Sequence, residues 1–388
     1  MISELRNKRS LTFYQQTTTT PKISITSDYT GGITAIAIST AVYTTASTTT
    51  QSNNQLNGFL NSLHSERDRI SQKVSEGLVN DPNYTGARGD GVKLAWDYEK
   101  ADVEMGGKGS ADWNTEQQQE IKETVKVRGA EGHHQKNVAD HPSDQGNPDN
   151  IKFYKSRKEH LEEGHDGNFQ NESDADYIDK NKMLKKTNGK RVFKNELRGV
   201  GIAAAIGVGV GFTIGFAVTL AQSGVTPDTL KYAIAEGGKS GASAGVQSIV
   251  GYGIGRTLGQ LATHALEGAL SNLGVTMTEN IIKMCNMGAI GAVTIAVFST
   301  CQFIKLVHNG MACKEAAIQV GKQALFSLSL LAVSIAAQGI WGGPAGLIVS
   351  ISTGIILITY ALADTVHQRH YSEKIRIYMI DKCKPSFA

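Results

Sequence analysis

The pattern of apolar and polar positions divides the 388-residue chain into a polar half and an apolar half. Beyond residue 198, three runs contain no Lys, Arg, Asp or Glu: residues 199–223, 284–304 and 323–363. A helix of about 20 apolar residues spans the hydrocarbon core of a bilayer, and the third run is long enough for two helices with a turn at Pro344. The pattern therefore predicts four transmembrane helices.

Glycines recur at every fourth position in this apolar region. Residues four apart lie on one helix face, where glycine lets a neighbouring backbone approach closely, so we expect helix packing and a homo-oligomer. A dinucleotide-binding loop in "GVGVGFTIG" is excluded, because no strand-turn-helix context or acidic residue at the right distance accompanies it. A soluble bundle shielded by oligomerisation remains the alternative to membrane insertion. The three series are Gly207, Gly211 and Gly215; Gly237, Gly241 and Gly245; and Gly251, Gly255 and Gly259.

Basic segments flank the apolar runs. Residues 180–198, 305–322 and 367–384 all carry net positive charge. Because positively charged loops are retained in the cytoplasm, four spans would place all three segments on the cytoplasmic side. The expected location is a bacterial inner membrane with the preceding polar domain in the cytoplasm, or the cytoplasm if the bundle is soluble.

The polar half changes character near residue 60. Residues 1–60 are rich in Thr, Ser, Gln and Asn and predict a flexible arm, whereas the charged residues 61–198 predict a soluble domain. Beyond them we expect a glycine-rich helical membrane bundle over residues 199–365 and a basic tail over residues 366–388.

Composition limits the partners. Lys and Arg number 39 against 36 Asp and Glu, a net charge of +3, so any nucleic acid must be bound by a local patch. The four cysteines form no C-x-x-C pair and have no histidine at zinc-finger spacing, which indicates reduced thiols in an intracellular protein. No apolar run follows the charged N-terminus within signal-peptide distance, so no secretory signal is expected.

Five of the ten histidines lie in one short window, residues 128–169. Neighbouring residues on a strand point to opposite faces, so one of His133 and His134 can bind a metal while the other faces a substrate. Imidazoles that hold one divalent ion would polarise a phosphodiester, while the free imidazole activates water as a general base. The five are His133, His134, His141, His160 and His165.

The residues that follow suggest how the window folds. The loop "DHPSDQGNPDN" ends in Asn150, whose amide can bond backbone groups. Ser156 predicts the cap of a short helix that would bring His160 and His165 back to the metal. Strand, loop, strand and helix in this order describe a metal finger over residues 128–170.

This window resembles the HNH endonucleases of the GHH type, on the run "GHH" followed by Asn and two later histidines. The resemblance covers about residues 80–175 and implies the ββα-metal fold of colicin-type DNases. It implies that His133 is the first metal ligand, that His134 is the general base, and that Asn150 braces the loop.

The resemblance also implies that His160 and His165 complete a site for one divalent ion, with Mg²⁺, Mn²⁺, Ni²⁺ and Zn²⁺ left open. As ligands of that ion, His133 and His160 count as catalytic residues beside His134 and Asn150. In colicin-type sites the last two histidines are four apart, but His160 and His165 are five apart, about 140° on a straight helix. A break or bulge at Gly164 is needed to bring His165 back, and His141 has no counterpart.

Positive charge near the metal is needed for phosphate contact. No base-reading motif is present, so the expected substrate is DNA cut with low sequence specificity, and RNA is not excluded. The expected backbone contacts are Arg128, Lys152, Lys155, Arg157 and Lys158.

The sequence thus predicts an α+β fold: a small ββα-metal nuclease domain followed by an all-α glycine-rich bundle in the membrane. Such a metal-dependent endonuclease would suit a toxin or a phage-defence effector. The alternative is a pore-forming or membrane-remodelling protein with a structural metal finger. His134 discriminates between them, because a structural site needs no free base.

Overall fold

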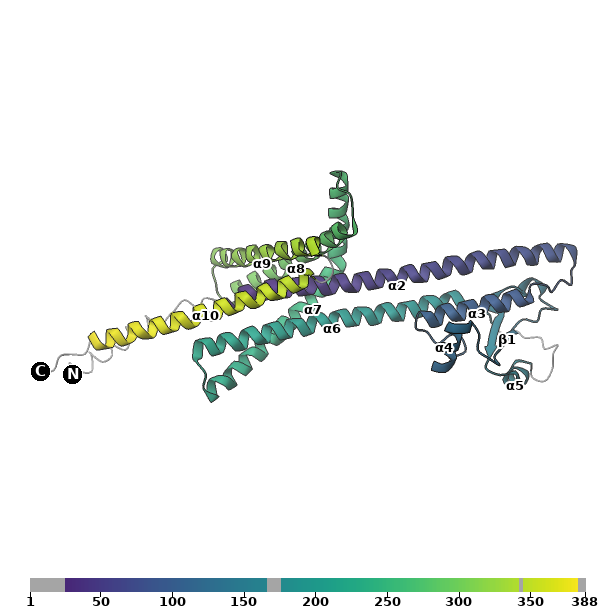
Figure 1. The fold of residues 1–388 in the computed structure, drawn as a ribbon, viewed down its shortest axis with the longest axis horizontal. Coiled ribbons are helices and arrows are strands. Elements are labelled where there is room, and N and C mark those ends of the chain that lie inside the picture. Colours follow the sequence, from purple (N-terminus) through teal and green to yellow (C-terminus); the bar gives the residue numbers. More distant parts are fainter. Residues whose placement is uncertain (1–24, 166–175, 342–344, 383–388) are drawn as a thin grey trace. The chain divides into compact units, whose positions relative to one another are not determined.

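The computed structural model describes residues 25–165, 176–341 and 345–382. They form two compact units, one of residues Thr45–Leu197 and one of the described residues on either side of it. The first unit contains a two-stranded sheet among helices, and the second is helical (Figure 1). The predicted α+β class, with a small ββα region followed by an all-helical region, is confirmed.

In the first unit, the two strands lie between three helices before them and α5, η3 and α6 after them. Asn114 caps α4 in a capping box with Gln117, and Ser156 caps α5 by accepting a hydrogen bond from the Glu159 N–H, as the sequence predicts. The elements in order are α2 (Ile25–Asn80), α3 (Arg88–Glu104), α4 (Thr115–Thr124), β1 (Glu131–His134), the 3₁₀ turns η1 (Pro142–Asp144) and η2 (Pro148–Asn150), β2 (Ile151–Tyr154), α5 (Arg157–Glu159), the π-helical turn η3 (His160–Gly164) and α6 (Lys180–Ser223).

Helix α2 overlaps most of the segment for which the sequence predicts a flexible arm. The structure makes residues 25–60 helical, and residues 1–24 of the predicted arm lie outside the described residues. The buried hydroxyls Thr45, Thr49 and Ser52 recur at helical spacing on one face of α2. Thr49 Oγ1 also donates to Glu196 on α6, at 3.3 Å. Composition alone misreads these residues, because their hydroxyls occupy the packed face of a helix.

Helices α2, α3 and α6 share one apolar core in the first unit. Side-chain hydrogen bonds also join α2 to α6, between His64 and Asn181 and between Asn53 and Asn188. The order of these pairs shows that the two helices run antiparallel. The core is made of Leu56, Leu60, Leu63, Ile70, Val74, Ala87, Leu94, Tyr98, Ala101, Met105 and Leu184.

A second cluster holds the sheet against α3 and α4. The ring centroid of Trp96 lies 5.5 Å from that of Trp113 and 4.0 Å from that of Phe153 on β2. Ile121 of α4 and Ile151 of β2 are fully buried in the same cluster. Aromatic packing therefore fixes the sheet on the helices, although the sheet has only two short strands.

A fully buried ion pair joins α3 to the start of α6. Lys180 Nζ lies 3.3 Å from Glu99 Oε1, and both side chains have no exposed surface. The Glu99 carboxylate also accepts from Trp113 Nε1 at 2.8 Å and from the Ser110 N–H at 2.7 Å. A buried carboxylate is tolerated only with such partners, so this network fixes the loop before α4 and the first residue of α6 together.

The second unit packs long helices through the predicted glycine series. A Cβ added at Gly211 of α6 would lie 2.6 Å from the Ser240 carbonyl oxygen and 3.0 Å from Gly241 Cα. At Gly259 it would lie 2.6 Å from Ile290 of α8. The series therefore face other helices of the same chain, while a homo-oligomer stays a prediction. The remaining helices are α7 (Pro227–Asn272), α8 (Glu279–His308), α9 (Cys313–Trp341) and α10 (Ala345–Lys382).

Three helices among the described residues are long and apolar enough to cross a membrane: α6, α8 and residues Cys313–Ala337 of α9. The fourth predicted span falls in the first half of α10, over residues 345–363, where most side chains lie outside the described part of the structure. The predicted turn at residues 342–344 also lies outside it. The predicted tail after residue 365 is helical as far as Lys382, because α10 continues through it.

Candidate metal centre and active site

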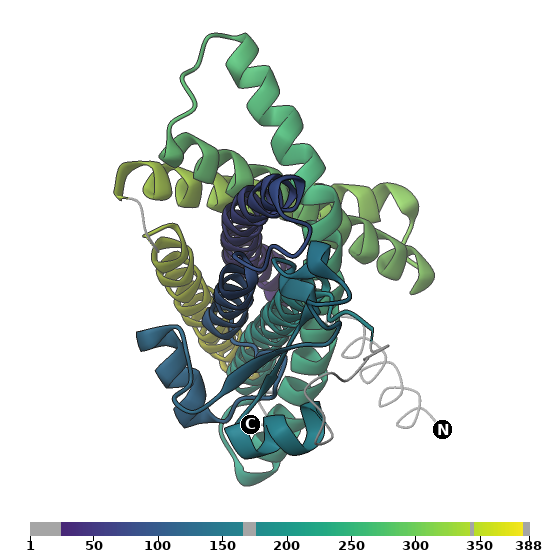
Figure 2. The ribbon, with the colours of Figure 1, turned by 90° about the vertical axis from the view of Figure 1, so that its right-hand side faces the viewer.

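The two short strands lie beside the helices of their unit (Figure 2) and pair antiparallel. In their register, His133 lies opposite Lys152 and His134 opposite Ile151. Directly opposed residues share a face, so the sheet has two different sides. Gly132 lies on the packed side, where an added Cβ would lie 3.0 Å from Val92 of α3, which explains the glycine of the GHH run. The packed side consists of Gly132, His134, Ile151 and Phe153, and the other of Glu131, His133, Lys152 and Tyr154.

Three histidines converge beside the face of the sheet that carries Glu131 and His133. One ring nitrogen from each of His133, His160 and His165 lies within 4.8 Å of the others. His133 Nδ1 is 3.1 Å from His160 Nε2, and the ring of His165 has its centroid 4.7 Å from each of the other two rings. The structure thus brings together all three residues predicted as metal ligands.

The five-residue spacing of His160 and His165 is accommodated by η3, a π-helical turn. A π turn bonds residues five apart, as an α-helix bonds residues four apart, so it brings this pair to the same side. Gly164 makes the turn possible, because an added Cβ would lie 2.9 Å from the Tyr154 ring and 3.0 Å from His160 Cδ2. The bulge that the sequence requires at Gly164 is therefore present.

Glu131 is a member of the site that the sequence reasoning missed. His160 Nδ1 lies 2.7 Å from Glu131 Oε2, and since the carboxylate accepts, Nδ1 carries a proton and Nε2 is the nitrogen that faces His133. Strand alternation was the available signal, because Glu131 stands two residues before His133 and so shares its face. Burial and the nearby His165 and His160 lower the pKa of His133 to about 4, so its ring is neutral at pH 7.

The donor set fits a divalent ion. Neutral imidazoles suit Zn²⁺, Ni²⁺ and other first-row metals. Two nitrogens bound to Zn²⁺ at about 2.0–2.1 Å in a tetrahedral site lie roughly 3.3 Å apart, close to the 3.1 Å between His133 Nδ1 and His160 Nε2. Glu131 supplies the carboxylate that commonly orients a metal-binding histidine.

Replacing Glu131 by Gln tests this orienting bond. We expect Glu131→Gln to weaken divalent-metal affinity about 10- to 100-fold, because the amide can present either a donor or an acceptor to His160 and no longer fixes its tautomer. Isothermal titration calorimetry on the full chain measures it, with the exposed Glu116→Gln as the control. Equal affinities for the two variants would show that Glu131 does not orient His160.

His134 lies on the packed side of the sheet and is bonded differently. Its Nε2 lies 3.0 Å from the Gln145 carbonyl oxygen, which can only accept, so Nε2 carries the proton. Its Nδ1 is buried and has no hydrogen-bond partner among the described residues. Burial lowers the pKa of His134, although the bond to Gln145 opposes this. The ring is therefore a neutral imidazole at pH 7, with a buried acceptor nitrogen that none of the described residues bonds.

Asn150 closes the loop between the strands, as predicted for a bracing residue. Fully buried, it accepts at Oδ1 from the Lys136 N–H at 2.8 Å and donates from Nδ2 to the Lys136 carbonyl at 3.0 Å. Sequence reasoning missed Gln145, whose side chain accepts from the Ala87 N–H and donates to the Tyr84 carbonyl. No residue-type signal marks it, because its contact with His134 uses the backbone.

The five predicted backbone-binding residues occupy different settings. Lys152 is exposed on the same face of the sheet as His133, with Nζ 4.7 Å from the centre of the Tyr154 ring. Lys155 Nζ donates to the Asp112 carbonyl, and Lys158 pairs with Glu162 at 3.8 Å. The side chains of Arg128 and Arg157 are exposed.

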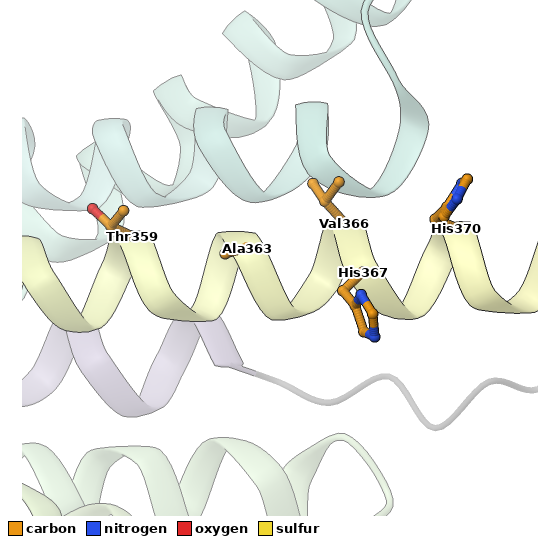
Figure 3. Close-up of a pocket in the computed structure, with 5 residues that line it drawn as sticks. All are labelled: Thr359, Ala363, Val366, His367 and His370. Carbon is orange, nitrogen blue, oxygen red and sulfur yellow. The ribbon is translucent and has the colours of Figure 1, made fainter.

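A hollow beside α10 also contains two histidines, lined by Thr359, Ala363, Val366, His367 and His370 (Figure 3). Figure 3 shows His370 on the same side of the helix as Val366, whereas His367 projects from the opposite side. These two rings do not converge as metal ligands must. The cluster at His133 is the candidate metal site that the described residues offer.

Comparison with known proteins identifies the region of the sheet. Residues 84–155 match the family model of the GHH signature containing HNH/Endo VII superfamily nuclease toxins. The match ends before His160 and His165, which the structure brings to His133. No curated protein and no solved structure matches the chain.

Proposed function

We propose that the protein is a metal-dependent endonuclease, because its residues 84–155 match the GHH-signature HNH/Endo VII family of nuclease toxins. It hydrolyses DNA with low sequence specificity and is anchored to a membrane by its helical unit. The observation that carries the proposal is the buried acceptor Nδ1 of His134. A buried polar atom left without a partner costs about 1–3 kcal/mol, so such an atom needs an explanation, and a catalytic role is one of them.

In this proposal His133, His160 and His165 hold one divalent ion, and Glu131 orients His160. The bound ion would supply Lewis-acid stabilisation of the phosphodiester oxygens. His134 accepts the proton of the attacking water at Nδ1, while the Gln145 carbonyl holds its Nε2 proton in place. Asn150 does not touch reacting atoms in this scheme and acts as a positioning residue for the loop.

Low specificity follows from the kind of contacts available. Lys152 is exposed on the face of the histidine cluster, and Arg128 and Arg157 are exposed on the same unit. Basic side chains neutralise phosphates without reading bases. The proposal therefore gives these residues, with Lys155 and Lys158, the role of binding the nucleic-acid backbone.

Membrane anchoring is supported by the length and surface of the second unit. Helices α6 and α8 and residues Cys313–Ala337 of α9 are each long and apolar enough to span a bilayer. Large apolar side chains such as Phe212, Leu261 and Ile304 are exposed on that unit, which suits acyl chains as their surroundings. A toxin or phage-defence effector that acts at the membrane would use this arrangement.

Plasmid cleavage by the full chain tests the proposal. We expect nicking of supercoiled DNA in Mg²⁺, Mn²⁺, Ni²⁺ or Zn²⁺, no nicking in EDTA, and loss of both bound metal and cleavage in His133→Ala. Flotation with liposomes in the same preparation tests anchoring. Bound metal without cleavage of DNA or RNA would favour the pore-forming alternative with a structural finger.

A further inference from the structure

The loop between the strands, residues 135–150, supports His134 at two points. The Gln145 carbonyl accepts the Nε2 proton of His134, at 3.0 Å. Asn150 bonds both backbone groups of Lys136, two residues after His134, and its carbonyl accepts from the Gln135 N–H at 2.8 Å. The position of this loop therefore sets the orientation of the His134 ring.

Helix α2 holds the end of that loop through one side chain. Arg67 Nη1 donates to Asp149 Oδ2 and Nη2 donates to Asn147 Oδ1, both at 3.0 Å. The guanidinium thus binds the side chains of Asn147 and Asp149, on either side of Pro148, in the turn that ends at Asn150. Two bonds from one guanidinium fix direction as well as distance, and the pair is partly buried, with 32% of the Arg67 side chain and 14% of the Asp149 side chain exposed.

Asp149 also connects the loop to the segment before α6. Its Oδ1 accepts from the Lys180 N–H at 3.1 Å, and its carbonyl accepts from the Ile178 N–H at 2.8 Å. With Oδ2 bonded to Arg67, both carboxylate oxygens and the carbonyl of Asp149 are engaged. Any shift of Arg67 would therefore act on the residue that immediately precedes Asn150.

The loop backbone is also packed against α2 and α3. A Cβ added at Gly146 would collide with the side chain of Ile70 on α2, and one at Gly91 on α3 would lie 2.5 Å from the Gln145 carbonyl oxygen. The carbonyl that bonds His134 thus lies where the two helices confine it. Arg67 is three residues from Ile70, so it extends this contact to the end of the loop.

We infer that Arg67 is a positioning residue for the reaction. It lies outside the segment 84–155 that matches the nuclease family, on a helix that the match does not include. Through Asp149 and Asn147 it holds the loop that orients His134 and contains Asn150. The inference rests on the proposed nuclease function only for its kinetic consequence, because the hold on the loop can be measured separately.

Full-length Arg67→Ala tests the inference, with Arg69→Ala as the matched control. Arg69 is on the same helix but pairs at the surface with Glu66, three residues away. We expect kcat for plasmid nicking to fall on the order of 10- to 100-fold in Arg67→Ala, with KM changed less than about threefold. Bound metal should be unchanged, because the histidine ligands come from β1, from η3 and from the residue directly after η3. Arg67→Lys keeps the positive charge but lacks the two guanidinium donors, so it should recover only part of the lost kcat.

Hydrogen exchange followed by mass spectrometry on the same proteins measures the loop directly. Peptides that cover residues 141–150 should exchange faster in Arg67→Ala than in the wild-type protein and at the wild-type rate in Arg69→Ala. Peptides from α4 should keep their protection in both variants. Exchange in the loop equal to wild type, or lost protection throughout the unit together with lost metal, would overturn the inference. If the wild-type protein cleaves no nucleic acid, the proposed function fails, while the exchange result still supports or overturns the hold of Arg67 on the loop.

Discussion

His134→Ala is expected to lower plasmid cleavage by about 10²- to 10⁴-fold, the usual contribution of a general base. The loss follows because Nδ1 is the buried acceptor that would take the proton from water. Bound metal should stay at the wild-type level, because the metal cluster uses His133, His160 and His165. Cleavage under saturating metal and metal analysis of the same sample measure the two quantities together.

His141→Ala serves as the control for His134→Ala. His141 lies in the loop that follows β1, is exposed and is outside the metal cluster, so its loss should leave cleavage and metal content unchanged. A His134→Ala protein that cleaves like wild type would remove His134 as the base. Loss of metal in His134→Ala would instead mean that the two faces of the sheet are not independent.

Glu99→Ala is expected to destabilise the nuclease unit by about 3–5 kcal/mol, because the Lys180 ammonium would remain buried without its partner. The indole N–H of Trp113 and the Ser110 N–H would lose their acceptor in the same change. Since native domains are stable by only about 5–15 kcal/mol, much of the unit's stability would be lost. Urea unfolding followed by tryptophan fluorescence measures it, because Trp96 and Trp113 lie in this core.

Two variants separate the buried charge from general damage to α3. Glu104→Ala removes a partly exposed partner of Lys100 on the same helix and should cost no more than about 1 kcal/mol. Lys180→Met should cost less than Glu99→Ala, because Glu99 keeps three donors from Ser110 and Trp113. An effect of Glu99→Ala as small as that of Glu104→Ala would contradict a structural role for the pair.

Much of the metal finger could be predicted because local chemistry dictates it. Asn114 and Ser156 mark helix starts by their capping side chains, and alternation along a strand separates His133 from His134. The spacing of His160 and His165 also predicts that a bulge at Gly164 is needed. These features depend on few residues that are close in sequence, so the chain alone carries them.

Residues 25–60 of the predicted arm show where such reasoning fails. Hydroxyl-rich composition is typical of flexible chain, but the helix over residues 25–60 places Thr45, Thr49 and Ser52 on its packed face. Glu196, the partner of Thr49, lies 147 residues away along the chain, and no local pattern indicates it. A large separation along the chain also conceals the role of Arg67, which bonds Asp149 in the loop between the strands, 82 residues later.

By itself the sequence determined the chemistry of the site: which histidines are present, the strand and turn that carry them, and the apolar, glycine-rich character of the second unit. Tertiary structure decided which atoms face each other. It placed Glu131 on His160, the Gln145 carbonyl on His134, and Arg67 on the end of the loop. The physical reason is that residue type and period fix local conformation, whereas the tautomer and orientation of a ring are fixed by partners that only packing brings near.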